Sequence, residues 1–530
     1  MREAIYPEVL CGRRKLHTGI DDITADNVIQ VLNSALIDHL WNVAEEEYLY
    51  WYRRGIQPVL EKQKHVREEI NNKIVENIAS SICAFKNGYF LTKPTFYTSR
   101  KESAEITDQV NKLNDFLYLS GKQQADNDLV DWFHTVGVAP LFVEATEDEE
   151  QVKAYALDPR QAANVYSYAP GEPAVMGFNV VLKADESGEA HHYYDVFTKR
   201  FIFHIKGLAP VSEGLYTSVQ PYNQNVLSIS EEEKVIESIE PNLLGEIPII
   251  EYTYDRNRMG AFEVVLGLLD AVSALQSDRL DSDEQFVNSL LVFYNCQLGQ
   301  DADGNDITPQ MIREAGAIFL KSVGQDKADL KEITSVLDQQ QTQVFMNDLL
   351  HQICNIAGMP FTGDPNTSDS SNVGATFLRN GWQTADTYAH NTEDLYRASN
   401  KQFDKIFLKI LKQKNEDLTL KASDIDVQFT RSELDNLLVK TQGALNLKQI
   451  GLSPELVLSK SGVSNDPVGD VKKSQKYIEA AYALGEASGT DNRTDIGNGS
   501  GRRDTEESTR DNNSVREQAS DVPAKDGDGE

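Results

Sequence analysis

Residues 245–286 read GEIPIIEYTYDRNRMGAFEVVLGLLDAVSALQSDRLDSDEQF, and this stretch decides the fold because its hydrophobic period changes part-way along. Its first part, residues 247–254, is rich in β-branched and aromatic residues, which is typical of a strand. From Gly260 onward the apolar side chains recur with the 3.6-residue period of a helix. The positions on that helical face are Phe262, Val265, Leu266, Leu269, Val272 and Gln276. The stretch therefore predicts a strand followed by a long helix that continues to about residue 292.

The chain before this stretch combines helical and extended patterns. Residues 23–90 predict helices, with a first apolar stripe at Val28, Val31, Leu32, Leu36 and Leu40 and a second helical run over about 66–85. Two more helices are expected at 106–119 and 128–138. The period changes near Pro140, and strands are then expected at 163–168, 175–182 and 193–205. This order predicts an α+β fold.

Residues 48–60, YLYWYRRGIQPVL, place aromatic rings beside Arg53 and Arg54. Such rings could stack on nucleic acid bases, but in an acidic chain we expect them to pack the end of a helix against the body. Gly55 and Pro58 predict the turn that follows.

The chain after residue 292 continues as a compact insert, a helix, a loop and a longer helix. The insert, 293–321, contains the turn GQDADGNDITP, and the helix over 338–358 is closed by Gly358 and Pro360. Residues 362–372, TGDPNTSDSSN, have the composition of an exposed mobile loop. A very long helix is expected over 373–413, a short strand at 425–429, and several helical pieces over 434–484.

The formal charge of −32 constrains the function, because 83 acidic residues face only 51 basic ones. Proteins that hold nucleic acid tightly displace phosphate counterions with a basic face, so tight DNA binding is disfavoured. The polar N-terminus has no signal-peptide core, and no window is apolar for long enough to span a membrane. The cysteines, Cys11, Cys83, Cys296 and Cys354, are far apart and are expected to be reduced and structural.

Motifs for catalysis and metal binding are absent from the sequence. It has no phosphate-binding loop, no H-E-x-x-H and no G-x-S-x-G. His191 and His192 lie in a predicted strand and are expected to point to opposite sides rather than share a metal. The segment from Asp301 resembles a calcium loop only at first, because its sixth and twelfth positions are Asp306 and Ile312 rather than glycine and glutamate. We expect no enzyme activity, no cofactor and no metal site.

Several ordered phrases resemble one family. They are YWYRRGIQPVL at 50–60, NNKIVEN at 71–77, GYFLTKP at 88–94, GVA at 137–139, the stretch 245–286, and VQFTRSELDN at 427–436. Together they resemble the portal proteins of long-tailed, siphovirus-type bacteriophages, over about residues 23–478. The small residues from Gly374 to Thr376 keep only part of the family's pattern.

The resemblance implies a multi-region portal fold, usually assembled as a ring of twelve subunits around a DNA channel. In this chain it implies an N-terminal extension at 1–22 and an α/β wing at 23–259. It then implies a helical stem at 260–292 and 338–358, with a small α/β clip between the two stem helices at 293–337. After the stem it implies a tunnel loop at 359–372, a long wing helix with a closing strand at 373–433, a helical crown at 434–485 and a disordered acidic tail at 486–530.

The resemblance also implies which residues meet other molecules. The tunnel loop is expected to line the DNA channel with Thr362, Asp364, Asn366, Thr367, Ser368, Asp369, Ser370 and Asn372. The clip tip is expected to contact a partner protein with Gln300, Asp301, Asp303, Asn305 and Asp306.

The implied partners are double-stranded DNA, which passes without sequence specificity, the terminase large subunit, a head-completion or adaptor protein, and the major capsid and scaffolding proteins. No membrane is involved. The implied location is the portal vertex of the virion capsid, reached after assembly in the host cytoplasm.

Two other functions can be compared with this interpretation. A packaging enzyme, either a nuclease or an ATPase, would need a phosphate loop or a metal-binding carboxylate cluster. Another virion structural protein, such as a head-completion component, would lack the order of helix, insert, helix, loop and long helix that follows Gly260.

Truncation after Gly485 is expected to leave ring formation intact, because residues 486–530 offer too little apolar surface to offset the entropy of ordering them. Limited proteolysis provides the measurement. Strong protection of the bonds near Arg502, Arg503 and Arg510 would show instead that the tail is docked.

Overall fold

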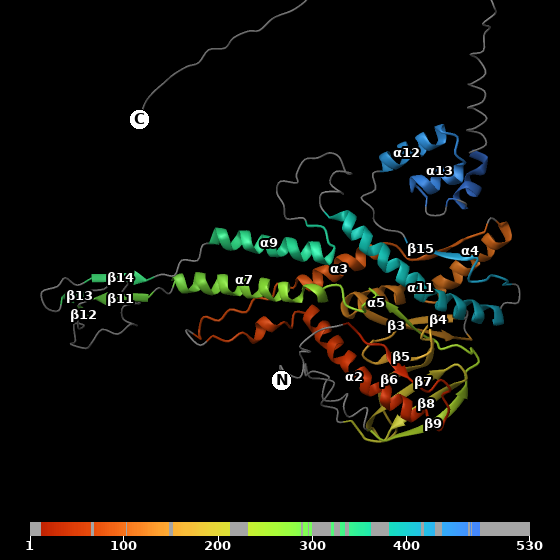
Figure 1. The fold of residues 1–530 in the computed structure, drawn as a ribbon, viewed down its shortest axis with the longest axis horizontal. Helices are drawn as coiled ribbons and strands as arrows, with labels where there is room; N and C mark the ends of the chain where they lie inside the picture. Colours follow the sequence, from red (N-terminus) through yellow and green to blue (C-terminus); the bar gives the residue numbers. More distant parts are fainter. Residues whose placement is uncertain are drawn as a thin grey trace, which may run out of the picture. The chain divides into compact units, whose positions relative to one another are not determined.

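The structure is a computed structural model (Figure 1) and consists of two compact units, residues 1–469 and 470–530. It describes residues 12–64, 68–101, 103–147, 152–211, 232–287, 290–294, 296–298, 320–322, 329–333, 339–361, 381–414, 418–429, 437–464, 467 and 469–477. Of the second unit it therefore describes only the helical residues 470–477. The mixture of helices and sheets confirms the predicted α+β class.

A six-stranded sheet and one long helix pack together in the N-terminal half of the chain. The strand order is β1 (Leu16–Thr18), β5 (Ala162–Ser167), β6 (Ala174–Ala184), β7 (Ala190–Thr198), β8 (Phe201–Gly207) and β9 (Lys234–Pro241), and only β1 and β5 are parallel. Helix α2 (Val28–Arg53) buries the predicted stripe, including Val28, Val31 and Leu32, against this sheet. The expected strand at 193–205 is thus two strands, joined at the turn between Thr198 and Phe201.

The largest apolar core surrounds a three-stranded sheet of β10 (Ile249–Thr253), β3 (Val138–Ala145) and β4 (Val152–Ala156). Helices α4 (Ala104–Leu119), α5 (Lys122–Val136) and α11 (Trp382–Lys414) contribute to it. A second small sheet pairs β15 (Ile425–Gln428) with β2 (Phe96–Ser99), so the predicted closing strand returns to the N-terminal half.

A polar network crosses this core between α5, β10 and α11. Lys122 is fully buried; it pairs with Asp126, and its Nζ donates to the Tyr396 hydroxyl at 2.8 Å. The Tyr396 hydroxyl in turn donates to Asp126 at 2.6 Å. Because each buried polar group here has a partner, the network fixes how α11 lies on the sheet.

The short helix η3 (Glu263–Val265) leads directly into helix α7 (Leu266–Val287). Helix α9 (Gln339–Ala357) lies beside α7. Between them the structure describes two ladders, β11 (Leu290–Tyr294) with β14 (Asp329–Ile333) and β12 (Cys296–Leu298) with β13 (Leu320–Ser322). The expected helix to residue 292 is therefore too long, because β11 already begins at Leu290. Helices α12 (Leu437–Gln449) and α13 (Pro454–Ser461) follow near the C-terminal end of the first unit.

The second expected helical run, 66–85, is wrong in its first half. Helix α3 spans Ile78–Phe90, after the short η1 (Pro58–Glu61), and residues 70–77 form neither helix nor strand. The turn at Gly55 and Pro58 is confirmed, since Gly55 has a φ of 91° and Pro58 opens η1. The rings of residues 48–60 pack inward as predicted: Tyr52 is fully buried and stacks on Phe262.

Residues 12–22, expected to be part of an N-terminal extension, pack against the sheet and α2. Leu16–Thr18 forms β1, and Arg13 is enclosed between α2 and the start of η3. Its guanidinium donates to Glu263 Oε1 at 2.7 Å and to the Val136 carbonyl at 2.8 Å, and lies 2.8 Å from Glu45 Oε2.

Glu46 lies beside this cluster, and its buried carboxyl group is not fully hydrogen-bonded. Its side chain is almost completely buried, and Oε2 has no hydrogen-bond partner among the described residues. Burial raises the pKa of Glu46 to about 8, against the opposing charge of Arg13.

Replacing Glu46 with Gln is expected to raise the free energy of unfolding at pH 7 by about 2 to 3 kcal/mol. The folded chain keeps this carboxyl protonated up to about pH 8, whereas the unfolded chain loses the proton near 4.5, so stability falls as pH rises through that window. Denaturant unfolding at pH 4 and pH 7 measures the effect, which should vanish at pH 4.

The matched control is Glu47→Gln, which breaks the 2.7 Å ion pair with Arg160 and should destabilise the chain at pH 7. An advantage of Glu46→Gln that is equally large at pH 4 would contradict the proposed protonation of Glu46.

Candidate functional site

The residues predicted to meet other molecules lie outside the described part of the chain. The clip tip, residues 300–306, and the contact residues of the tunnel loop, residues 362–372, are not among the residues that the structure describes, so their roles stay predictions. The structure does describe the elements that flank them, and the joint where these elements meet is the candidate functional site.

Helices α7 and α9, the predicted stem helices, are held together by apolar and polar contacts. Val272 of α7 and Met346 and Ile353 of α9 belong to one buried cluster. Further along the helices, Arg279 donates to Gln339 and Gln343 on α9, each at 3.1 Å. The pair therefore behaves as one packed unit over its described length.

Residues 70–77, which we call the strap, run along α7 in place of the expected helix. The amide of Ile74 donates to Ser277 Oγ at 2.9 Å, and the amide of Glu76 donates to Ser273 Oγ at 3.3 Å. Because both serine hydroxyls accept from a segment some 200 residues away in sequence, tertiary contacts replace the hydrogen bonds that a helix would have made.

Asp281 anchors the other end of the strap. Its buried carboxylate accepts from the Asn72 amide at 2.7 Å and pairs with Lys64 at 2.5 Å and Lys62 at 2.9 Å. Burial alone would raise the pKa of Asp281, but these hydrogen bonds outweigh it and hold the pKa well below its usual range. Asp281 is therefore a buried structural anion.

A buried carboxylate in η3 ties the start of α7 to the segment before β1. Glu263 in η3 accepts from Arg13 through Oε1 and from the Gly260 amide, at 2.7 Å, through Oε2. Burial raises the pKa of Glu263, and the charge of Arg13 opposes that rise. Arg13 thus connects the first described residues of the chain to the first turn of the stem.

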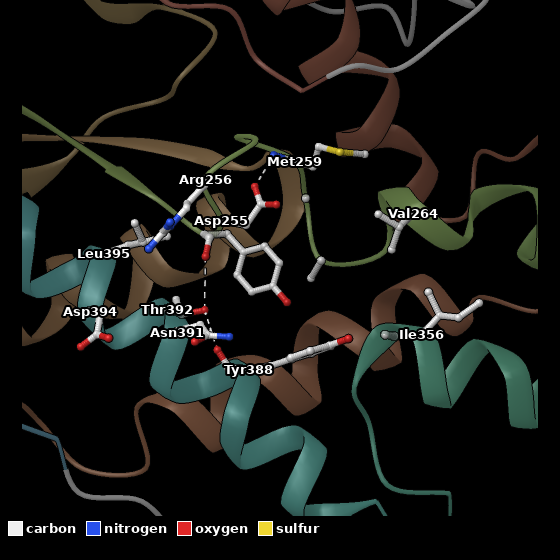
Figure 2. A pocket seen from close by; sticks show the side chains of 14 residues that line it. Asp255, Arg256, Met259, Val264, Ile356, Tyr388, Asn391, Thr392, Asp394 and Leu395 are labelled. Atoms are coloured by element: carbon white, nitrogen blue, oxygen red, sulfur yellow. Dashed lines mark hydrogen bonds between the residues drawn. The ribbon is translucent and has the colours of Figure 1, made fainter. Parts of the chain in front are cut away.

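A pocket of about 570 Å³ lies beside this joint (Figure 2). It is bounded by the loop after β10, the C-terminal end of α9 and one face of α11. Val264 and Ile356 lie at one side, and the ring of Tyr388 extends from α11 toward Ile356 (Figure 2). Tyr254 also lines the pocket. The Thr392 hydroxyl donates to the Tyr254 carbonyl at 3.2 Å, which holds α11 to the loop.

Gly358 closes α9 next to Ala357, which lines the pocket, as the sequence predicted. Its φ is +65°, and a Cβ at this position would lie 2.1 Å from the Tyr388 ring. Both the backbone conformation and the close approach of the ring require glycine here.

Lys86 of α3 lies behind the two tyrosines. Its Nζ is 5.5 Å from the centre of the Tyr254 ring and 5.2 Å from the centre of the Tyr388 ring. No hydrogen bond or ion pair joins Lys86 to the described residues, and burial lowers its pKa to about 8. The ammonium group of Lys86 is therefore held mainly by the faces of these two tyrosine rings.

For metal ligands, membrane-spanning helices and cysteines, only the described residues can be compared with the predictions from the sequence. His191 Nδ1 contacts the Gly207 carbonyl at 3.0 Å, whereas His192 Nδ1 contacts Glu232 at 3.2 Å, so the two histidines have separate partners. In this part of the chain no three His, Cys, Asp or Glu side chains are grouped to hold a metal ion. No described helix is both long and apolar enough to cross a membrane. Cys83 and Cys354 are free and buried.

A family model described as "Phage portal protein, SPP1 Gp6-like" matches residues 37–482. The chain belongs to this phage portal family. A portal protein is a structural component of the virion capsid and not an enzyme, and the family implies an oligomeric ring. The predicted resemblance to phage portal proteins is thereby confirmed.

Other comparisons add little to the portal assignment. No curated protein matches the portal chain. A chain in the solved structure "Neck of empty GTA particle computed with C6 symmetry" is similar at 12% identity and a TM-score of 0.36, over 73% of this chain and 90% of that chain.

Sequence reasoning missed the residues that build the joint of the portal subunit. Arg13, Glu263 and Lys86 are single charges without a motif, and their partners lie far away in sequence. The one usable signal was Glu263 within the first apolar turn of the stem helix, where a charge needs a buried partner.

Replacing Lys86 with Met is expected to raise the free energy of unfolding at pH 7 by up to about 3 kcal/mol. The unfolded chain holds this proton up to about pH 10.5 and the folded chain only up to about 8, so stability from this group rises between these values. The gain from Lys86→Met should therefore shrink as pH approaches 10.

Thermal or denaturant unfolding at pH 7 and pH 10 gives the comparison, with the exposed Lys112→Met on α4 as the control. A loss of stability at pH 7 in Lys86→Met would mean that the ammonium group has a partner that compensates for its burial.

Proposed function

We propose that the chain forms, with further copies of itself, a ring of twelve subunits at one capsid vertex, through which double-stranded DNA passes during packaging and ejection. The observation that carries this proposal is the family match over residues 37–482. The order of the described elements supports it, because the α7 and α9 pair brackets small β-ladders and the long α11 follows.

In this proposal each region has its own task. Helices α7 and α9 form the stem around the channel, residues 293–337 form the clip, and α12 and α13 belong to the crown. The tunnel loop, residues 359–372, lines the narrowest part of the channel. The buried joint of Arg13 and Glu263 supports the assignment of wing and stem, because the base of a channel wall needs a rigid attachment.

The acidic balance of the chain supports a conduit more than a DNA-binding protein. A formal charge of −32 in each subunit disfavours the several phosphate contacts that make release slow and salt-dependent. DNA that is weakly repelled can slide. Residues 362–372 carry two aspartates and no lysine or arginine, which fits steric and weak polar contact with the duplex.

The proposed partners follow from the same layout. The clip tip, with Gln300, Asp301, Asp303, Asn305 and Asp306, contacts a head-completion or adaptor protein, since its composition is polar and turn-like. The terminase large subunit docks on the ring during packaging, and the major capsid and scaffolding proteins surround it during assembly in the host cytoplasm.

Deleting residues 366–371 is expected to leave rings assembled but to impair packaging or retention of DNA, because the shortened loop no longer reaches the duplex. Electron microscopy of the purified protein counts rings with a central hole, and nuclease protection measures the packaged DNA. A deletion of equal length in the tail, residues 505–510, is the control.

Two outcomes would count against the proposal in different ways. Wild-type protein that stays monomeric under all conditions would contradict the ring itself. Rings of the deletion variant that package full genomes at the wild-type rate and yield would remove the tunnel loop from the mechanism.

A further inference from the structure

The pocket beside the start of α7 has large apolar side chains that are exposed in the single chain. Val264 is 56% exposed and Ile356 is 45% exposed, and they border a space of about 570 Å³ that is lined largely by apolar groups (Figure 2). Isolated exposed apolar side chains are ordinary, but two of them beside a concave pocket are typical of a surface that another protein covers.

The charges around the pocket indicate what kind of protein covers it. Arg256 lies on the rim and is exposed, and no ion pair joins it to any described residue. Asp255 and Asp394 also line the pocket, so its charge is mixed, but Asp255 already accepts from the Met259 amide. Arg256 is thus a local site for a carboxylate, which a second copy of this chain, with its 83 acidic residues, supplies.

Ring assembly supplies the reason for a second copy. The contacts of a closed ring are heterologous, so one face of each subunit must fit a different face of the next. Because every subunit carries the same net negative charge, association requires apolar burial or local pairing of opposite charges. The pocket offers both at the point where stem and wing meet.

We infer that this pocket is part of the interface between subunits: the neighbouring copy inserts an apolar side chain between Val264 and Ile356 and places a carboxylate beside Arg256. The inference rests on the proposed ring. Since the pocket is bounded by the loop after β10, by α9 and by α11, a subunit seated in it contacts stem and wing at once. Assembly would then hold the joint in one arrangement.

The test is ring assembly by the double variant Val264→Asp, Ile356→Asp, measured by electron microscopy and light scattering of the full-length protein. Both side chains are exposed in the single chain, so the folded subunit and its melting temperature should change little. The fraction of protein in rings is expected to fall by about tenfold or more, because charges would be buried at the centre of the contact.

The matched control is Leu243→Asp, an exposed leucine after β9 outside the pocket, which should assemble as the wild type does. Arg256→Glu is expected to weaken assembly and Arg256→Lys to preserve it. Normal rings of the double variant would overturn the inference while leaving the ring intact. Equal loss of rings in the control would also overturn it, because assembly would then respond to any added charge; wild-type protein without rings would instead contradict the proposed function.

Discussion

The ion pair between Arg13 and Glu263 is the interaction on which the remaining architecture depends. Both side chains are fully buried, so removing Arg13 would leave Glu263 as an uncompensated charge in the interior, whereas Arg13 is also paired with Glu45 at 2.8 Å. The pair joins the segment before β1 to the first turn of the stem, and Glu263 also receives the Gly260 amide. The pair therefore ties the start of α7 to the segment before β1 through polar contacts as well as through the apolar contacts along α7.

The sequence predicted the elements whose pattern is local. The stripe of α2, the strand that precedes the stem helix and the glycine that closes α9 each follow from the periodicity or the backbone requirement of a few neighbouring residues. The family was likewise predicted from the ordered phrases, because their residues and their order can be read from the sequence without the fold.

The failures have a common physical cause. Residues 70–77 have a helical pattern, but hydroxyl and carboxylate groups of α7 satisfy their amides from about 200 residues away. The end of α7 was placed too late because an apolar run such as residues 290–294 suits either a helix or a strand. The pocket could not be predicted at all, because it is made by one loop and the faces of two helices that meet only after folding.

The strap has a mechanical consequence. Its amides and side chains attach at Ser273, Ser277 and Asp281, which are spread over more than two turns of α7. A force along α7 would load these attachments in parallel, as shear, rather than one after another, as in peeling. The strap continues directly into α3, whose Ala79, Ile82 and Cys83 belong to the same buried cluster as the base of the stem. Axial strain on α7 would thus pass through these hydrogen bonds into the strap and on to α3, along a route independent of the joint at Glu263.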